Sequence, residues 1–276
     1  MGRFSGGNGR TDREERREAP WGLSFNQKRV SGMTTNFYAP PSAFRGDRVV
    51  LPDDEARHVC SVLRAEAGDT MTVVDGEGGW HRVRIDQATP TQVVGTVQET
   101  RRDVGEPPVD VTVGLGVLTK RSRFETFVEK AVELGVRRIV PLTTRHTETG
   151  SVRPDRLRKV MIAALKQCRR SRLPALSAVQ PLADVLADTG ADARLLCHGG
   201  ADATPLPSAL NAAGPATRVL VLVGPEGGFA DAEVAAAMEA GCTPVALGRR
   251  RLRAETAALA ALNGIVMGAE GGEADV

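Results

Sequence analysis

The chain has 276 residues, of which 41% are hydrophobic and 25% charged, a composition typical of a globular protein and not of a fibrous or disordered one. Its 36 basic and 34 acidic residues nearly cancel, so net charge says little about partners. The most apolar uncharged stretch, Thr256–Ala269, is shorter than the roughly 18 residues that a membrane span needs. Four widely separated cysteines favour neither a disulfide framework nor a zinc site, and this pattern indicates a cytoplasmic protein.

Residues 1–32 differ from the rest of the chain. They are rich in Gly and Arg, alternate in charge and have no apolar period, which predicts a disordered leader. The leader has no apolar run typical of a secretory signal, and its acidic residues argue against an organelle transit peptide. Met33 stands directly before the first patterned segment, so we expect that translation can start there and that the leader carries no function.

Residues 34–102 predict a small β-barrel domain, because short β-rich runs are separated by turn clusters such as Asp75–Gly79. The runs are Arg48–Leu51, Thr70–Asp75, Trp80–Ile85 and Gln92–Gln98. Between the first two, Asp54–Arg64 has apolar residues at helical spacing. With 8 basic and 10 acidic residues, this domain is not marked by charge as nucleic-acid binding. Charge, Gly105 and two prolines interrupt the pattern at Arg101–Pro108 and predict a domain linker there.

Residues 108–270 alternate between strand and helix, which predicts an α/β domain with a largely parallel sheet. The predicted strands are Val109–Leu118, Arg138–Leu142, Ala193–Cys197, Arg218–Val223 and Thr243–Leu247. The predicted helices are Phe124–Leu134, Pro154–Arg170, Asp231–Ala240 and Arg253–Met267. The last helix is apolar nearly all round, so we expect it to be buried on more than one side.

Charge is unevenly distributed along this α/β domain. Residues 120–172 hold 15 basic and 5 acidic side chains, whereas residues 184–245 hold 2 basic and 8 acidic ones. A solvated helix face or a genomic preference for Arg codons would also give many arginines, but the second does not explain why they cluster. We therefore interpret residues 120–172 as a surface for a polyanion, since the planar guanidinium grips phosphate and stacks on unpaired bases.

Two glycine-rich segments are candidates for ligand binding. Gly114-Leu115-Gly116 begins like a dinucleotide-binding fingerprint, but Thr119 stands where the third glycine is needed, which argues against a nicotinamide enzyme. Gly224-Pro225-Glu226-Gly227-Gly228 follows the apolar strand Val219–Val223 directly. Such a loop at the carboxyl end of a buried strand lets backbone amides approach a ligand closely, so we predict a binding loop rather than a plain turn.

A third segment, Leu247–Ala258, turns from a strand end into the last helix and carries four arginines in five positions. Glu255 and Thr256 suit the first turn of that helix, where anionic and capping groups are favoured. Because the arginines are attached to a buried helix, we interpret them as part of a site and not as solvated surface.

Taken together, these segments resemble the small-subunit ribosomal RNA uridine-N3 methyltransferases of the knotted SPOUT superfamily. The resemblance covers about Phe37 to Met267, in the order and spacing of that family. Two positions depart from the family pattern: Arg251 replaces an apolar residue and Arg169 replaces a common glycine. The residues that carry the resemblance are Gly224–Gly228, Leu247-Gly248 with Arg250, Leu252-Arg253 and Glu255-Thr256-Ala257, the helix Glu129–Val136, and His58 with Val62-Leu63-Arg64.

The resemblance implies a PUA-like barrel at 34–102 followed by a SPOUT domain at 108–270 with a deep trefoil knot, working as a homodimer. It also implies that S-adenosylmethionine is the methyl donor, that no metal is required, and that the substrate is 16S ribosomal RNA in the small ribosomal subunit. The cofactor-binding residues it implies are His198, Gly199, Gly224, Pro225, Glu226, Gly227, Gly228, Leu247, Gly248, Leu252 and Ala257.

For the reaction itself, methyl transfer to uridine N3 needs loss of the imide proton and stabilisation of charge on the uracil oxygens. We expect Arg253 and Arg250 to do this, with Glu255 and Thr256 positioning their loop; Glu226 or water would take the proton. The expected RNA-binding residues are Arg64, Lys120, Arg121, Arg169, Arg170 and Arg172. The main alternative is a noncatalytic RNA-binding or ribosome-assembly factor on the same scaffold, which would bind RNA without binding S-adenosylmethionine.

Overall fold

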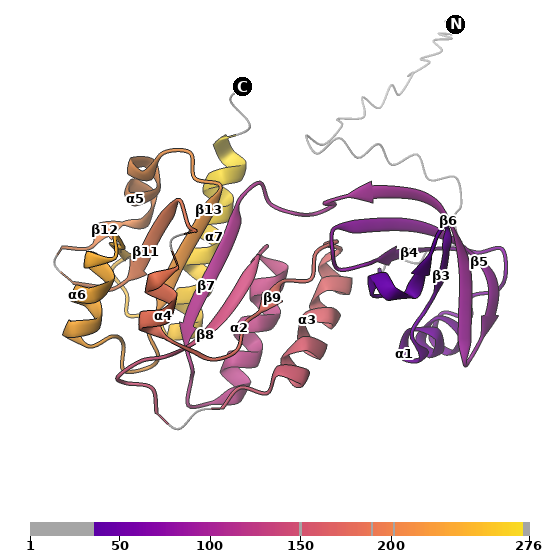
Figure 1. Ribbon diagram of the computed structural model, residues 1–276, viewed down its shortest axis with the longest axis horizontal. Coiled ribbons are helices and arrows are strands. Elements are labelled where there is room, and N and C mark those ends of the chain that lie inside the picture. Colours follow the sequence, from indigo (N-terminus) through magenta and orange to yellow (C-terminus); the bar gives the residue numbers. More distant parts are fainter. Residues whose placement is uncertain (1–35, 149–150, 189, 201, 273–276) are drawn as a thin grey trace, which may run out of the picture. The chain divides into compact units, whose positions relative to one another are not determined.

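The computed structural model describes residues 36–148, 151–188, 190–200 and 202–272 (Figure 1). The predicted disordered leader at 1–32 therefore lies outside the described residues. Within them, no helix is both long and apolar enough to cross a bilayer.

The first part of the described chain folds into one six-stranded curled sheet, with strand order β1-β4-β5-β6-β3-β2. Its elements are β1 (Phe37–Tyr38), η1 (Pro41–Ala43), β2 (Phe44–Arg45), β3 (Arg48–Val50), α1 (Asp53–Arg57), η2 (His58–Val62), β4 (Thr70–Val74), β5 (Gly79–Thr89) and β6 (Gln92–Arg102). The strand pairs are antiparallel except β1 with β4. Each of the four predicted β-rich runs overlaps one strand, and β5 and β6 extend beyond the predicted bounds.

The predicted helix at Asp54–Arg64 is only partly α-helical. The α-helix α1 ends at Arg57, and the chain continues as one π-helical turn, η2, over His58–Val62. Ala56 and Val59 are buried in the core of this domain, as their helical spacing predicts. Arg64, which follows the helix, is exposed and has a left-handed backbone (φ 53°).

The second part of the described chain is an α/β fold whose sheet is entirely parallel, which confirms the predicted class. The strand order is β10-β8-β7-β13-β11-β14-β12, and β9 pairs with β8. Its strands are β7 (Asp110–Gly116), β8 (Arg138–Thr143), β9 (Ala175–Leu176), β10 (Gln180–Pro181), β11 (Ala193–Cys197), β12 (Thr204–Pro205), β13 (Arg218–Val223) and β14 (Thr243–Ala246). Its helices are α2 (Arg121–Glu133), α3 (Pro154–Cys168), α4 (Leu182–Ala187), α5 (Leu206–Ala213), α6 (Asp231–Glu239) and α7 (Ala254–Gly272).

The two faces of this sheet are covered by different helices. On β13, Val219, Val221 and Val223 point into the core cluster that includes α2, α3, α5 and α7, whereas Leu220 and Leu222 point into the cluster that includes α4 and α6 (Figure 1). This alternation follows from the period of two in a strand. A strand buried on both faces reads as an unbroken apolar run, which is why β13 is recognisable in the sequence.

Helix α7 is buried on several sides, as its composition predicts. It packs against β7, β13, α2 and α5. Small residues make this possible: a Cβ added at Gly264 would lie 2.8 Å from Leu206 Cδ2 of α5. Helix α7 therefore fixes the position of the arginine-rich segment that precedes it.

Candidate functional site

A cavity of about 510 Å³ lies where the carboxyl ends of β11 and β13 meet the segment before α7. Parallel strands end at one edge of the sheet, and this edge is where α/β proteins bind ligands. The cavity thus combines three segments that are far apart in the sequence. Its lining consists of Arg123, Cys197, His198, Gly199, Val223, Gly224, Pro225, Glu226, Gly227, Gly228, Phe229, Arg251, Leu252, Arg253, Ala254 and Ala257.

The loop Gly224–Gly228 is closed on itself by a tight turn, in which the Gly228 amide donates to the Pro225 carbonyl at 2.9 Å. Gly228 has a left-handed backbone (φ 72°) that side chains disfavour. A Cβ at Gly224 would lie 2.8 Å from the Gly228 carbonyl carbon, so the turn itself requires glycine there. The glycines therefore bring backbone amides to the wall of the cavity.

Gly114 and Gly116, which begin like a dinucleotide fingerprint, serve packing instead. A Cβ at Gly116 would lie 2.4 Å from the Pro225 nitrogen, and one at Gly114 would lie 2.7 Å from Leu222 Cδ2. These glycines let β7 lie close to β13 and to the loop that follows it.

Two carboxylates attach this loop region to neighbouring segments. Glu226 accepts a hydrogen bond from the Thr119 backbone amide, with Oε1 at 3.1 Å. Glu233, on α6, accepts from the Ala230 amide at 2.8 Å through Oε2 and from the Arg145 amide at 2.7 Å through Oε1. Glu226 thus joins the glycine loop to the segment after β7, and Glu233 caps the helix that follows the loop.

In the arginine-rich segment, the structure separates residues that the sequence presents as one run. Arg251 and Arg253 line the cavity, whereas Arg250 is exposed and is not among the lining residues. Leu247 packs against the core, and Gly248 has a left-handed backbone (φ 115°) at the turn. Thr256 is exposed outside the lining, and Ala257 lies within it. The two arginines best placed to reach a ligand are therefore Arg251 and Arg253.

Arg123 is a cavity residue that the sequence analysis missed. It lies in the first turn of α2, and its Nε is 3.7 Å from Oε1 of Glu255, in the first turn of α7. Glu255 is nearly buried, and its Oε2 is buried with no hydrogen-bond partner in the described part of the chain. Glu255 is thus a positioning group that joins α7 to α2. The sequence offers only one signal for the pair, an Arg inside the cationic segment 120–172.

The strand end Cys197-His198-Gly199 supplies the third wall of the cavity, as predicted for His198 and Gly199. Cys197 was not predicted. Burial raises the pKa of its thiol to about 12, so at neutral pH it is a small apolar wall and not a nucleophile. The sequence could have indicated Cys197 as a cavity residue, because it is the last residue of a predicted apolar strand.

The residues predicted to bind RNA fall into two groups. Lys120, Arg121 and Arg169 are exposed, and Arg121 donates to Ser151 Oγ from Nη2 at 2.6 Å. Arg172 is partly exposed and forms an ion pair with Asp103. These four, and Arg64 on the barrel domain, are accessible to a large ligand.

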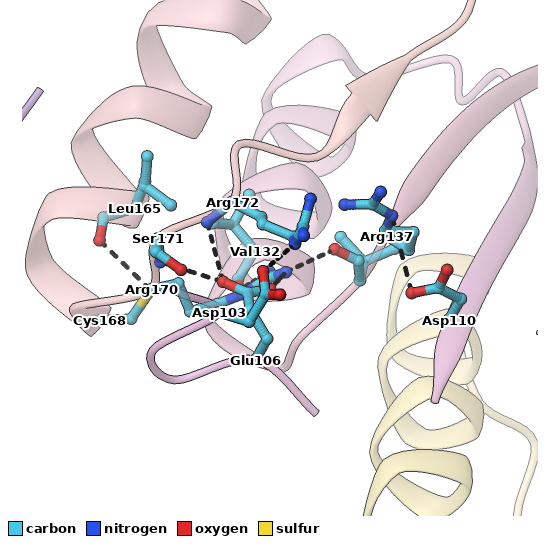
Figure 2. Close-up of polar contacts among 11 residues, drawn as sticks. Asp103, Glu106, Asp110, Val132, Arg137, Leu165, Cys168, Arg170, Ser171 and Arg172 are labelled. Atoms are coloured by element: carbon cyan, nitrogen blue, oxygen red, sulfur yellow. Dashed lines mark hydrogen bonds and ion pairs between the residues drawn. The ribbon is translucent and has the colours of Figure 1, made fainter. Parts of the chain in front are cut away.

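Arg170 requires a correction, because its side chain is only 3% exposed. Figure 2 shows the polar contacts around it. Its Nη2 donates to Oε2 of Glu106 at 2.6 Å, and its guanidinium also donates to the carbonyls of Val132 and Val136 at 2.7 and 3.0 Å. The other oxygen of Glu106 accepts from the amides of Ser171 and Arg172. A guanidinium with these partners has no free face for a phosphate, so Arg170 holds the linker to the α/β domain and the expected RNA contact is wrong.

Metal ligands do not cluster anywhere in the described residues: no group of three or more His, Cys, Asp or Glu side chains is placed to hold an ion. The cavity offers amides, guanidinium groups and apolar side chains. This chemistry suits an organic ligand with both polar and apolar parts.

Comparison with known proteins finds similar domains in both parts of the described chain. The family model of an RNA methyltransferase domain matches residues 105–272, and the family model of an RNA methyltransferase PUA domain matches residues 51–98. Ribosomal RNA small subunit methyltransferase E of Mycobacterium bovis is 31% identical over 83% of this chain and 90% of its own length.

Two solved structures are also similar. A probable rRNA-methyltransferase from Porphyromonas gingivalis has a TM-score of 0.77 and 34% identity, covering 86% of this chain and 99% of that one. Ribosomal RNA small subunit methyltransferase E from Neisseria gonorrhoeae, bound to S-adenosyl methionine, has a TM-score of 0.73 and 29% identity, covering 84% and 96%. The resemblance noted in the sequence is thereby confirmed, and this chain belongs to the RNA methyltransferase family that includes ribosomal RNA small subunit methyltransferase E.

Proposed function

We propose that this protein transfers the methyl group of S-adenosylmethionine to N3 of a specific uridine in 16S ribosomal RNA. The observation that carries the proposal is the single cavity that unites the Gly224–Gly228 loop with Arg251 and Arg253. The family supports a methyltransferase, and the relative from Neisseria gonorrhoeae binds S-adenosyl methionine. Specificity for N3 is the part that this proposal adds.

The cavity fits the cofactor in size and in chemistry. Its volume of about 510 Å³ lies within the roughly 300–1,000 Å³ of sites for small organic ligands. Val223, Phe229 and Leu252 give it apolar walls, while His198-Gly199 and Gly224–Gly228 present backbone groups. Bound there, S-adenosylmethionine supplies an electrophilic methyl group on its sulfonium.

The arginines act on the other reactant. As the imide proton leaves N3, negative charge develops on the two uracil oxygens, and guanidinium groups fixed nearby stabilise it without reorganising. Arg253 is our first choice for this role and Arg251 the second, because both line the cavity. Arg250 is exposed outside the cavity lining, and we assign it a contact with the RNA backbone. N3 lies on the pairing edge of the base, so the uridine must be unpaired or flipped out before it can enter.

Water is the proton acceptor that we propose. Glu226 is exposed and its carboxylate already accepts from the Thr119 amide, which makes it a loop-positioning group. A carboxylate is a weak base for the weakly acidic imide proton, and water is a weaker one, so loss of this proton to solvent depends on the arginines that stabilise the uracilate. Glu255, paired with Arg123, and the neighbouring Thr256 position the segment that carries Arg253.

Ribosomal RNA would also lie across the exposed cations Lys120, Arg121, Arg169 and Arg172, with Arg64 as a contact from the barrel domain. Arg170 is excluded from this surface. A protein acting on ribosomal RNA in this way would work in the cytoplasm, on RNA of the small ribosomal subunit.

A trefoil knot and a homodimer complete the proposal. Supporting observations are the sheet order, in which the late strand β13 lies between β7 and β11, and the small apolar residues with which α7 packs on several elements. Tracing the chain in an experimental density map would test the knot. Light scattering on the purified protein would test the dimer.

The function is tested by incubating the protein with radiolabelled S-adenosylmethionine and unmethylated small ribosomal subunits, then mapping the labelled nucleotide. We expect label on N3 of one uridine of the 16S RNA, and labelling slower by about 100-fold or more with Arg253→Ala. Label on another atom would overturn the assigned position. RNA binding without S-adenosylmethionine binding, measured by calorimetry, would favour the noncatalytic alternative.

A further inference from the structure

The barrel domain has a cationic outer sheet face that the predicted RNA contacts do not include. On β5, Val83 and Ile85 are buried in the core of the domain, whereas Arg82 and Arg84 are exposed. Successive side chains of a strand point to opposite faces, so these two arginines share the outer face.

The outer face continues over the neighbouring strands. Arg84 pairs with Thr96 of β6, Thr96 pairs with Arg48 of β3, and Arg48 pairs with Arg45 of β2. Directly opposed residues lie on the same face of a sheet, so Arg84, Arg48 and Arg45 form one row across four strands. All three are exposed, and Arg84 also pairs with Asp86, with Nη2 3.2 Å from Oδ1.

A tryptophan lies at the other end of this face. Trp80 pairs in register with Arg101. The guanidinium carbons of Arg101 and Arg82 lie 5.1 and 6.0 Å from the indole centroid, within cation–π range. Both guanidinium groups also pair with Glu99, at 2.7 and 3.3 Å. Trp80 is half-buried and packs against the cluster that includes Val74 and the core of the α/β fold, and not against the core inside the barrel, which fixes the indole on the outer face.

Charge is segregated within the barrel domain. The outer face carries Arg45, Arg48, Arg82, Arg84 and Arg101 against two acidic residues, Asp86 and Glu99, although residues 34–102 as a whole hold more acidic than basic side chains. Three of the remaining acidic residues lie together on α1, at Asp53, Asp54 and Glu55. Arginines gathered on one face beside an anchored aromatic ring match a polyanion with stacking bases, which is RNA.

We propose that this outer face binds a single-stranded segment of the RNA substrate, with a base stacked on Trp80 and phosphates held by the row Arg45, Arg48 and Arg84. The proposal rests on the proposed function for the identity of the substrate as RNA. It assigns a second contact region, separate from the cavity and from the cations of residues 120–172. Its role is to hold RNA and not to take part in methyl transfer.

Tryptophan fluorescence tests the stacking directly, because the chain has two tryptophans and Trp21 is the other. In the full-length Trp21→Phe variant, we expect a 20-mer of oligouridylate to quench the remaining emission and to protect it from acrylamide. Emission and acrylamide accessibility that do not change at saturating RNA would overturn the stacking contact. This measurement needs no methyl transfer, so its outcome is independent of the catalytic assignment.

Substitutions test the face as a whole. We expect Trp80→Leu, which keeps an apolar side chain on the core, to weaken oligouridylate binding on the order of 10-fold. The triple variant Arg45→Ala, Arg48→Ala, Arg84→Ala is expected to lower the slope of log K against log salt by roughly 2, since each lost phosphate contact removes about 0.7. Both variants should raise KM for transcribed 16S RNA and leave S-adenosylmethionine affinity unchanged.

Arg57→Ala is the matched control, because Arg57 is an exposed arginine of the same domain that lies on α1. If Arg57→Ala lowers the slope of log K against log salt by as much per arginine as the triple variant does, the effect is one of general charge and the proposal is overturned. Unchanged RNA binding in Trp80→Leu and in the triple variant, both folded by circular dichroism, would also overturn it. Methylation that persists in that case would leave the proposed function intact.

Discussion

Two arginine-rich segments of the methyltransferase domain look alike in the sequence but have opposite roles in the structure. Arg249–Arg253 precedes helix α7, and its members Arg251 and Arg253 line the cavity. Arg169–Arg172 follows helix α3, and its central residue Arg170 is buried against Glu106. The first segment presents two arginines to a cavity, whereas the central arginine of the second holds the chain together.

The partner of each segment explains the difference. Glu106 lies 64 residues before Arg170 and brings two carboxylate oxygens to Arg170 and to the amides of Ser171 and Arg172. Arg253 lines the same cavity as the glycine-rich loop Gly224–Gly228. A cluster of arginines therefore indicates a site only where the fold leaves its guanidinium groups accessible and does not bury them against an acidic partner.

The largest effect is expected at Arg170. Arg170→Ala would leave the carboxylate of Glu106 buried without its cation, which costs about 3–5 kcal/mol of unfolding free energy in comparable pairs. Urea denaturation followed by circular dichroism measures the loss. Arg169→Ala, at the exposed neighbour, should change stability by less than about 0.5 kcal/mol. If the Arg170→Ala protein kept its stability but lost RNA affinity, Arg170 would be an RNA-binding residue after all.

The next effect is expected at Arg253. Arg253→Ala should lower kcat by about 100- to 1,000-fold, the usual cost of removing one preorganised donor to developing charge. Affinity for S-adenosylmethionine, measured by calorimetry, should stay nearly the same, because glycine backbone and apolar groups form the cofactor walls. A fully active variant would remove Arg253 from the mechanism and break the contrast between the two segments.

Much of the fold could be predicted because its signals are local. The apolar runs of β7, β11 and β13 and the periodic faces of α2 and α3 lie within single segments, and the structure has them within a few residues of the predicted bounds. Helices α4 and α5, of 6 and 8 residues, are too short for a clear period and were missed.

The site was predicted only where one segment carries the whole signal. The Gly224–Gly228 loop is recognisable because a buried strand and three glycines adjoin. Arg123 was missed because its role depends on Glu255, more than a hundred residues later. Arg170 was misinterpreted because its partner Glu106 is also distant in the sequence. Pairing between distant segments is a property of the tertiary fold and leaves no local pattern.

A smaller effect distinguishes the neighbours within the first segment. Arg251→Ala should lower kcat/KM about 10-fold, the value of one hydrogen bond to a charged group. Arg250→Ala should have little effect on turnover of a short RNA, because Arg250 is exposed and outside the cavity lining. Steady-state kinetics on both variants measures the difference. The reverse order would mean that the segment rearranges when RNA binds.

The smallest effect is expected at Arg169, which ends α3 with a left-handed backbone (φ 64°). Glycine is the residue that such a C-terminal cap favours, so Arg169→Gly should raise the unfolding free energy by up to about 1 kcal/mol. Arg169→Ala keeps the strain and serves as the control for charge. If Arg169 contacts RNA, both variants should lower the salt slope of RNA binding equally, by roughly 0.7–0.9. If Arg169→Gly is more stable and neither variant changes the salt slope, Arg169 is a surface cap with no RNA contact. Lys120, Arg121 and Arg172 would then be the remaining RNA contacts of this region.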